Sequence, residues 1–265
     1  ALLSLRERRN LHIAGAALRL LGRTDYDSIV IPNGSILEFG ALYRTAKHLG
    51  RRVATYEFGE QRGHLWLAQD AEVMRLPTDG LWGERGAAPL SDAEVRQLQD
   101  LYAARRQGSR FGRSWQTGVS RGAQAARERL GLRADQPMAL LCTNVVGDSL
   151  ALDRQIFTQG MADWLATTAR HFARSSQAQL VVRVHPGEML GAGHPSVDIL
   201  RDALPHLPPQ VILVPPESEI NTYDLIELAH VGMVYTTTVG MEMAMFGVPA
   251  IVSGATNYRG MGFTD

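Results

Sequence analysis

The second half of the chain alternates short apolar runs with longer amphipathic segments, and this alternation constrains the fold more than any other feature. The apolar runs, which suggest strands, lie at 138–142, 180–184, 211–214, 232–235 and 250–252. Apolar residues at helical spacing lie at 157–176, 222–229 and 240–246. Continuous apolar runs are typical of parallel strands buried on both faces. The pattern therefore predicts an α/β fold whose helices cover both faces of a parallel sheet.

The first half repeats this pattern in a shorter form. Helical spacing at 2–21 is followed by a strand at 28–31, a helix at 36–49 and a strand at 52–57. Strand, helix and strand within about 30 residues predict a βαβ unit. Turn residues without any period suggest a loop over 76–89, after which Ser91 and Glu94 form a capping box that opens a helix. A further helix is expected over 120–130.

These patterns predict two domains. Because a domain averages roughly 150 residues, a chain of 265 residues can hold two small ones. We expect an N-terminal α/β unit at 1–115, a linker at 116–137 and a C-terminal Rossmann-like domain at 138–265. The N-terminal unit has only two convincing strands, which is few for an independent sheet, so we expect it to be incomplete.

Composition excludes several classes of function. Lys plus Arg total 27 and Asp plus Glu total 27, so the chain lacks the basic excess of a protein that binds nucleic acid by bulk charge. A single cysteine, Cys142, excludes intrachain disulfides and cysteine-based zinc sites. No histidine or carboxylate spacing indicates a metal site, and no P-loop, dinucleotide fingerprint or serine-hydrolase elbow follows a strand. No apolar run is long enough for a transmembrane helix.

Polar residues follow the predicted strands of the second half. Since ligands of open parallel sheets bind beyond the carboxyl ends of the strands, these residues are the candidate binding site. They are Thr143 and Asn144 after the first strand, His185 and Pro186 after the second, and Thr236, Thr237, Thr238, Gly240 and Glu242 after the strand at 232–235.

The segment TTTVGME has the composition of a phosphate site. Three hydroxyl groups precede the start of a helix, and Gly240 permits a close approach of the ligand. Glu242 would repel a phosphate at contact distance, so its carboxylate is better suited to accept hydrogen bonds from a ribose or sugar diol. The alternative is that Thr236 and Thr238 only cap the helix.

Three ionisable residues are candidates for catalysis. His185 ends a strand and precedes a proline, a position from which it could donate to a phosphate or act as a general acid. The alternative is a structural histidine in a turn. In the first half, Glu57 and Glu60 follow a strand and could supply an acceptor-side base across an interdomain cleft, or they could be solvated loop carboxylates.

The ordered set of motifs resembles a known family. These motifs are TNVVGDS, DWL at 163–165, VVRVHPGE, ESEINTYDLIELA, VYTTTVGMEMAMFGVPAIV and GATNYRGMGFT. Together they resemble the bacterial capsule polysaccharide biosynthesis proteins and the C-terminal half of GT-B glycosyltransferases. The resemblance covers 138–265 well and 25–70 more loosely. It implies two Rossmann-like domains that face a cleft, in the GT-B arrangement.

The resemblance also implies roles for the candidate residues. His185 of the HP motif and the hydroxyl groups of Thr236, Thr237 and Thr238 would contact the donor phosphate, and Glu242 would bind the ribose or sugar hydroxyls. GT-B enzymes have further N-terminal strands and a C-terminal helix that crosses back, neither of which this sequence contains.

We therefore expect a metal-independent GT-B glycosyltransferase of a surface polysaccharide pathway. Its nucleotide-sugar donor would be a substrate, with no cofactor, and its acceptor an oligosaccharide or lipid-linked glycan. We expect it in the cytoplasm, with peripheral association with a membrane polysaccharide assembly complex as a further expectation, and with no nucleic-acid partner. The alternatives are a nucleotide-sugar 2-epimerase and a catalytically silent sugar-nucleotide-binding subunit.

Overall fold

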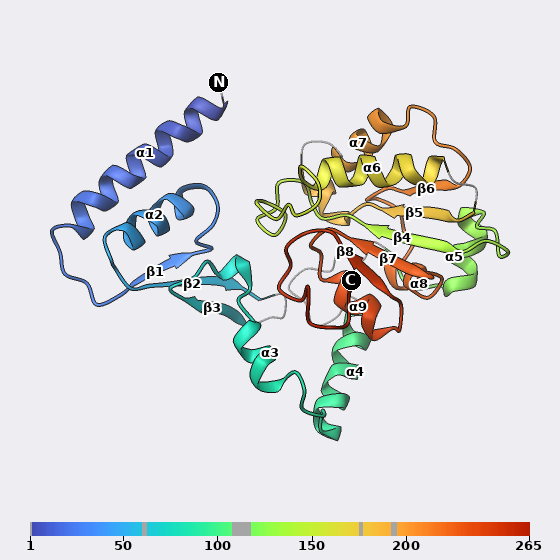
Figure 1. Cartoon of the computed structure of the whole chain (residues 1–265), viewed down its shortest axis with the longest axis horizontal. Helices are drawn as coiled ribbons and strands as arrows, with labels where there is room; N and C mark the ends of the chain where they lie inside the picture. The colour runs from blue at the N-terminus through green and yellow to red at the C-terminus, as the bar shows by residue number, and fades with distance from the viewer. Residues whose placement is uncertain (1, 60–62, 108–117, 175–176, 192–194) are drawn as a thin grey trace. The chain divides into compact units, whose positions relative to one another are not determined.

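The chain divides into two compact units, which are described separately. The computed structural model describes residues 2–59, 63–107, 118–174, 177–191 and 195–265 (Figure 1). Unit 1 runs from Ala1 to Ala87 and unit 2 from Ala88 to Asp265. Both combine helices with strands, so the predicted α/β class is confirmed.

Unit 1 contains a three-stranded sheet in the order β1-β2-β3. Its elements are α1 (Leu2–Leu21), β1 (Ile29–Pro32), α2 (Leu37–His48), β2 (Val53–Phe58), β3 (Leu65–Gln69), the 3-10 helix η1 (Val73–Arg75) and α3 (Asp79–Arg85). β1 pairs with β2 in parallel, with Ile29 opposite Val53, which confirms the predicted βαβ unit. β3 then pairs with β2 in antiparallel orientation, with Thr55 opposite Ala68.

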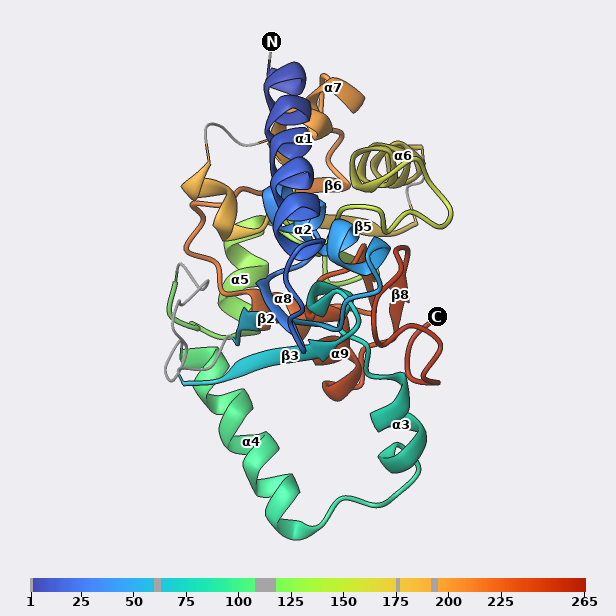
Figure 2. The same cartoon turned by 90° about the vertical axis from the view of Figure 1, so that its left-hand side faces the viewer.

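The core of unit 1 lies between its sheet and its first two helices. α1 runs along α2 (Figures 1 and 2), and Ala17 and Leu21 of α1 share a buried cluster with Ile31 and Val53 of the sheet. Side chains that alternate with these along the strands lie at the surface, among them Val30, at 63% exposure.

Unit 2 contains a five-stranded parallel sheet in the order β6-β5-β4-β7-β8. Its strands are β4 (Met138–Cys142), β5 (Gln179–Arg183), β6 (Val211–Val214), β7 (Val231–Val234) and β8 (Ala250–Val252). Its helices are α4 (Asp92–Gln107), α5 (Ala123–Leu130), α6 (Met161–Ala173), the 3-10 helix η2 (Pro186–Leu190), α7 (Pro195–Ala203), α8 (Thr222–Ile226) and α9 (Val239–Met245).

Helices cover both faces of this sheet, as the apolar runs predicted. Leu140 of β4 packs in one cluster with residues of α5, α8 and α9. Its neighbour Leu141 points to the opposite face and packs with Trp164 of α6 and Leu200 of α7. Because successive side chains of a strand alternate between faces, the continuous apolar sequence of β4 fills both clusters. Figure 1 shows α6 and α7 on one side of the sheet and α5, α8 and α9 on the other.

The division between the units falls earlier in the chain than the linker expected at 116–137. The reason is that buried carboxylates of unit 2 bind the segments before α5. Asp224 of α8, at 3% exposure, accepts hydrogen bonds from the Ser120 hydroxyl and the Arg121 N–H, and it forms an ion pair with Arg106 of α4. The segment expected to be a linker therefore contains α5, whose Ala126 belongs to the core of unit 2.

Some predicted elements need correction and one motif is confirmed. Residues 76–89, expected to be a loop, contain α3, and neither β3 nor α7 was predicted. The capping box is present: the Ser91 hydroxyl and N–H donate to the Glu94 carboxylate, and the Glu94 N–H donates to Ser91 Oγ. Among the helices described, none is long and apolar enough to cross a membrane.

The buried contacts of Asp224 lead to a prediction about stability. We expect Asp224→Asn to lower the free energy of unfolding by about 1–3 kcal/mol, because an amide cannot accept both hydrogen bonds and loses the charge that faces Arg106. Chemical denaturation measures the change. The matched control is Asp135→Asn, which breaks a solvent-exposed ion pair with Arg133 and should leave the stability almost unchanged. Equal losses for the two variants would contradict the anchoring role of Asp224.

Candidate functional site

The strand order of unit 2 places a topological switch point beside β4. From β4 the chain moves outward through β5 to β6 and then returns to the other side of β4 as β7. The connections that leave β4 and β7 therefore diverge at their carboxyl ends, and ligands of doubly wound sheets bind at such points. The residues after β4 and β7 are Thr143–Asn144 and Thr236–Thr238, which the sequence singled out.

Two adjacent side chains after β4 tie the neighbouring strand ends together. Thr143 Oγ1 accepts a hydrogen bond of 3.0 Å from the His185 N–H, which follows β5. Asn144 Oδ1 accepts one of 3.1 Å from the Thr236 N–H, which follows β7. Thr143 and Asn144 are both buried. The structure thus brings together the candidates after β4, β5 and β7, and it gives Thr143 and Asn144 a role in positioning the others.

His185 is a neutral imidazole in this structure. Its Nδ1 accepts a hydrogen bond of 2.9 Å from the Gly187 N–H at the start of η2, in which Pro186 is the first residue. Burial lowers the pKa of His185 to about 4, an effect that Asp148 opposes and Arg183 reinforces. Because Nδ1 is an acceptor, the single proton of the neutral ring lies on Nε2. His185 can therefore donate a hydrogen bond without carrying a charge.

The turn from Thr236 to Thr238 contributes hydroxyl groups after β7. Thr236 is 6% exposed, and its Oγ1 has no hydrogen-bond partner among the residues described. A buried hydroxyl without a partner is unusual and is a candidate ligand contact. The turn is held by Tyr258, whose hydroxyl donates a 2.6 Å hydrogen bond to the Thr237 carbonyl. Tyr258 lies after β8 in the motif GATNYRGMGFT, to which the sequence analysis assigned no site residue.

Gly240 lies where any larger residue would collide with its surroundings. A Cβ atom at this position would be 2.5 Å from the Tyr258 hydroxyl and 2.9 Å from a methyl carbon of Val234. The glycine therefore allows α9 to approach Tyr258 closely. The sequence predicted a close approach at Gly240, but to a ligand, and the contact in the structure is with the chain itself.

Both carboxylate oxygens of Glu242 already have partners within unit 2. One binds the Arg105 guanidinium of α4, and the other accepts a 2.9 Å hydrogen bond from the Tyr223 hydroxyl of α8. Burial raises the pKa of Glu242, while Arg105 and Tyr223 lower it. The expected contact of Glu242 with ribose or sugar hydroxyls remains a prediction, and such a ligand would share a carboxylate that also holds α4 and α8.

Arg183, at the end of β5, has a structural role. Its guanidinium is 2% exposed and donates hydrogen bonds to the carbonyls of Pro215, at 2.7 Å, and Ser218, at 3.5 Å. These contacts hold the loop after β6 against the carboxyl edge of the sheet. Burial lowers the pKa of Arg183 to about 10, so it remains a cation at neutral pH.

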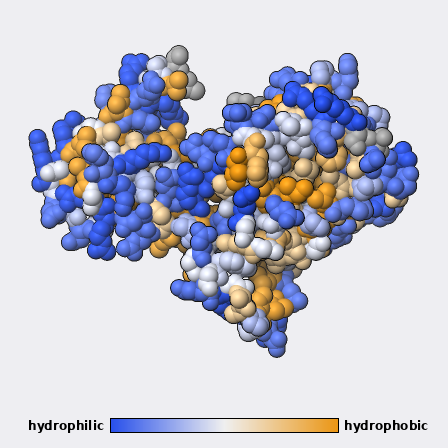
Figure 3. All heavy atoms as spheres, in the orientation of Figure 1, coloured by the Kyte–Doolittle hydropathy of each residue, from blue (hydrophilic) through white to orange (hydrophobic). Residues whose placement is uncertain are grey.

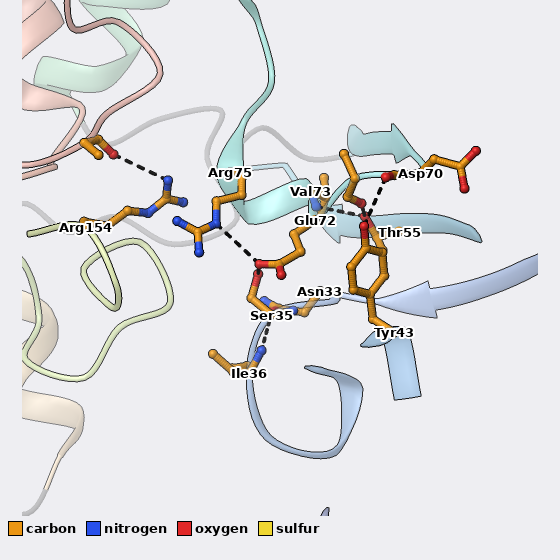
Figure 4. A network of polar contacts seen from close by, with 12 residues as sticks. Asn33, Ser35, Ile36, Tyr43, Thr55, Asp70, Glu72, Val73, Arg75 and Arg154 are labelled. Carbon is orange, nitrogen blue, oxygen red and sulfur yellow. Dashed lines mark hydrogen bonds and ion pairs between the residues drawn. The ribbon is translucent and has the colours of Figure 1, made fainter. Parts of the chain in front are cut away.

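The acceptor-side candidates belong to unit 1. Glu57, at the end of β2, accepts a 3.0 Å hydrogen bond from the Asn33 side chain after β1, and its other oxygen accepts one from the Phe58 N–H. Figure 4 shows the polar network next to Asn33, in which the Ser35 hydroxyl donates to Glu72. Glu60 lies outside the described residues. Whether either glutamate acts as a base remains a prediction.

The described residues contain no cluster of three or more His, Cys, Asp or Glu side chains that could hold a metal ion. No family model matches the chain, and no curated protein sequence matches it.

Two solved structures share its fold over most of its length. One is the beta Kdo 2,4 transferase of Thermosulfurimonas dismutans KpsC, with a TM-score of 0.56 and 17% identity, which covers 90% of this chain and 72% of that one. The other is the beta Kdo 2,7 transferase of the same protein, with a TM-score of 0.55 and 14% identity, over 100% and 80% of the two chains. The fold is that of these transferases. The predicted likeness to capsule polysaccharide transferases is thereby confirmed at the level of the fold, with two Rossmann-like parts in one chain.

The buried neutral state of His185 predicts how stability depends on pH. The folded pKa of about 4 lies below the ordinary value of 6.5, so the unfolded chain binds more protons between these pH values. Stability should therefore fall as the pH falls from 7 towards 4. Between pH 7 and pH 5 we expect the parent to lose about 1–2 kcal/mol more than His185→Asn, as measured by urea denaturation. A parent whose stability falls no more steeply with pH than that of His185→Asn would contradict this account.

The contact between Arg105 and Glu242 leads to a second prediction. Arg105→Ala should lower the free energy of unfolding by about 2 kcal/mol at pH 8, since it leaves a buried carboxylate without its cation. The loss should be smaller at pH 5, because without Arg105 the pKa of Glu242 rises further and the carboxyl binds a proton more readily. Arg129→Ala, which removes a half-exposed partner of Glu219, is the control. A loss independent of pH would contradict this account of Glu242.

Proposed function

We propose that the protein is a glycosyltransferase that moves a sugar from a nucleotide-sugar donor onto a bacterial capsule or other surface polysaccharide. The observation that carries the proposal is the switch-point cluster of unit 2, where Thr143 and Asn144 bind the backbone N–H groups of His185 and Thr236. This is the position at which doubly wound folds bind nucleotides. The fold shared with two Kdo transferases supports sugar transfer as the reaction.

The chemistry follows from the protonation state of the cluster. When the bond between the sugar and the phosphate breaks, negative charge builds up on the leaving phosphate oxygen. In this proposal the Nε2–H of His185 and the hydroxyl groups of Thr236, Thr237 and Thr238 donate hydrogen bonds to the phosphate oxygens. Donors that are already fixed in place stabilise this charge without reorganisation during the reaction. The reaction needs no metal ion or separate cofactor.

The acceptor side of the proposal rests on unit 1. Glu57 would take the proton of the attacking acceptor hydroxyl, and Asn33 would hold the carboxylate through their 3.0 Å hydrogen bond. Glu60 is the alternative base. The acceptor would be an oligosaccharide or a lipid-linked glycan, used in the cytoplasm at a membrane polysaccharide assembly complex.

Two other functions remain in competition with glycosyl transfer. A nucleotide-sugar 2-epimerase would change the stereochemistry of a UDP-sugar in the absence of any acceptor, which NMR of the sugar protons detects. A silent binding subunit would bind nucleotides without any turnover. A transferase needs both substrates and releases the nucleotide only when the acceptor is present or when water replaces it.

The direct test measures nucleotide binding by the whole chain. Calorimetry with CMP, UDP and GDP should identify at least one nucleotide that binds the parent. His185→Ala and Thr236→Val should each weaken that affinity about tenfold, the equivalent of roughly one hydrogen bond to a charged group. Thr236→Val keeps the shape of the side chain and removes a hydroxyl without a partner, so thermal stability should not fall.

The matched control is Thr167→Val, which removes an exposed hydroxyl from α6. It should leave both affinity and stability unchanged. If none of the three nucleotides binds the parent, the proposal fails. If they bind but Thr236→Val binds equally well, the switch-point turn is not the phosphate site.

A further inference from the structure

The phenol of Tyr258 lies against the turn that the proposed function assigns to the donor phosphate. Tyr258 is 1% exposed, and its hydroxyl donates a 2.6 Å hydrogen bond to the carbonyl of Thr237. Burial raises the pKa of Tyr258 well above its ordinary value, so the hydroxyl stays protonated and remains a donor. The hydroxyl can therefore donate this bond at neutral pH.

The segment that carries Tyr258 is itself fixed to the sheet. The Ser253 N–H donates to the Val234 carbonyl at 3.0 Å, and the Gly254 N–H donates to the Tyr235 carbonyl at 2.9 Å. The ring of Tyr258 stacks on Phe263, with centroids 6.2 Å apart and planes at 19°. The segment before Tyr258 is thus held by the sheet and its ring is held by Phe263, so its hydroxyl is a fixed point against which the turn can be positioned.

The bond from Tyr258 helps to orient one peptide plane, together with the longer hydrogen bond of 3.3 Å that the Gly240 N–H donates to the same carbonyl. The C=O of Thr237 and the N–H of Thr238 belong to the same planar trans peptide and point in opposite directions. While Tyr258 binds the carbonyl, this peptide plane cannot rotate freely. The Thr238 N–H and the side chains on either side of the peptide therefore keep their directions. On the other side of the turn, Asn144 holds the Thr236 N–H.

Gly240 allows this arrangement of Tyr258 and the turn because it has no side chain. A Cβ atom there would lie 2.5 Å from the Tyr258 hydroxyl, which is too close for any real contact. The first turn of α9 and the Tyr258 phenol therefore fit together only with glycine at this position. Two features from distant parts of the sequence, at 240 and 258, thus constrain the same turn.

We propose that Tyr258 is a positioning residue for donor binding, which holds the Thr237–Thr238 peptide so that the turn presents its hydroxyl groups to a nucleotide phosphate. This inference rests on the proposed function and adds to it a residue that need not touch the donor. Its action passes through the Thr237 carbonyl. The expected consequence is that loss of the phenol hydroxyl weakens binding of the phosphate part of the ligand, and not binding of the nucleoside part.

The test compares Tyr258→Phe with a matched variant, Tyr43→Phe. The Tyr43 hydroxyl in unit 1 also donates to a backbone carbonyl, that of Asp70 at 3.0 Å, so both variants lose the same kind of bond. Calorimetry of the whole chain uses whichever of CMP, UDP and GDP binds the parent, together with the corresponding nucleoside. We expect Tyr258→Phe to raise the Kd for the nucleotide about tenfold and to leave the Kd for the nucleoside unchanged. The ratio of the two Kd values should therefore become smaller. Tyr43→Phe should change neither value.

A second pair of variants tests the contact between Tyr258 and the turn without removing a hydroxyl group. Gly240→Ala places a methyl group against Tyr258 and should also weaken nucleotide binding. Gly80→Ala, with no atom within 4 Å of the added carbon, is its control and should bind as the parent does. Circular dichroism at the temperature of the titration shows whether each variant is folded. If Tyr258→Phe is unfolded, the test rests on Gly240→Ala. Its Kd for the nucleotide is then compared with those of the parent and of Gly80→Ala.

The outcomes separate the inference from the proposed function. Nucleotide binding by Tyr258→Phe within twofold of the parent overturns the role of Tyr258 and leaves the proposed function intact. An equal loss in Tyr258→Phe and Tyr43→Phe also overturns it, because the effect is then one of general stability. If no nucleotide binds the parent, the proposed function itself fails.

Discussion

The organisation of unit 2 depends on two neighbouring side chains, Thr143 and Asn144, at the end of the central strand β4. Each uses a side-chain oxygen to accept the backbone N–H of the strand extension beside it, towards His185 on one side and Thr236 on the other. Beyond the last ladder bonds of a parallel sheet the strands have no reason to remain in register. These two bonds keep the three strand ends together past that point. A polar residue at a strand end can therefore build a site without contacting the ligand.

Two buried carboxylates hold further segments of unit 2 together, on the side of the sheet that α8 and α9 cover. Asp224 and Glu242 are almost fully buried, and each is bound by groups from the segments that precede the sheet, namely Arg106, Ser120 and Arg105. Isolated ions are too costly to bury, so such carboxylates must be accompanied by their partners. Their presence requires that α4 lie against α8 and α9. The first helix after unit 1 thus becomes part of unit 2, and the expected linker becomes part of its surface.

The sequence predicts those parts of the fold in which local pattern and burial agree. The strands of unit 2 are mostly apolar because both faces are covered, so β4 to β8 were recognisable from their composition. β3 was not, since Leu65, Trp66 and Leu67 are all exposed and carry no alternation of apolar and polar residues. The division of the chain after Ala87 could not be read from a local pattern for a different reason. The attachment of α4 to unit 2 includes the pairing of Arg105 with Glu242, residues 137 positions apart, and no local pattern records that pairing.

The candidate site divides in the same way. Thr143, His185 and Thr236 could be found because each immediately follows a recognisable strand. The segment of Tyr258 was recognisable as a motif after β8, but the role of Tyr258 was not, because it depends on the contact that its hydroxyl makes with the Thr237 carbonyl. Glu242 shows the converse, since its position in TTTVGME suggested a ligand contact while the structure reveals two partners within the chain.

If the protein is the transferase proposed above, the neutrality of the switch-point cluster has a consequence for catalysis. A cluster of cations would bind a nucleotide phosphate tightly before the reaction as well as during it, and only the difference between the two accelerates the chemistry. Neutral donors, such as the Nε2–H of His185 and the threonine hydroxyls, gain more as charge accumulates on the leaving oxygen than they gain from the resting ester. The burial that lowers the pKa of His185 to about 4 keeps the ring in this neutral state at any pH near 7. The nearby cation, Arg183, is directed instead to the carbonyls of Pro215 and Ser218, where it shapes the loop after β6. Arg183 therefore organises the edge of the sheet, while His185 and the threonine hydroxyls would donate hydrogen bonds to the charge that develops on the phosphate.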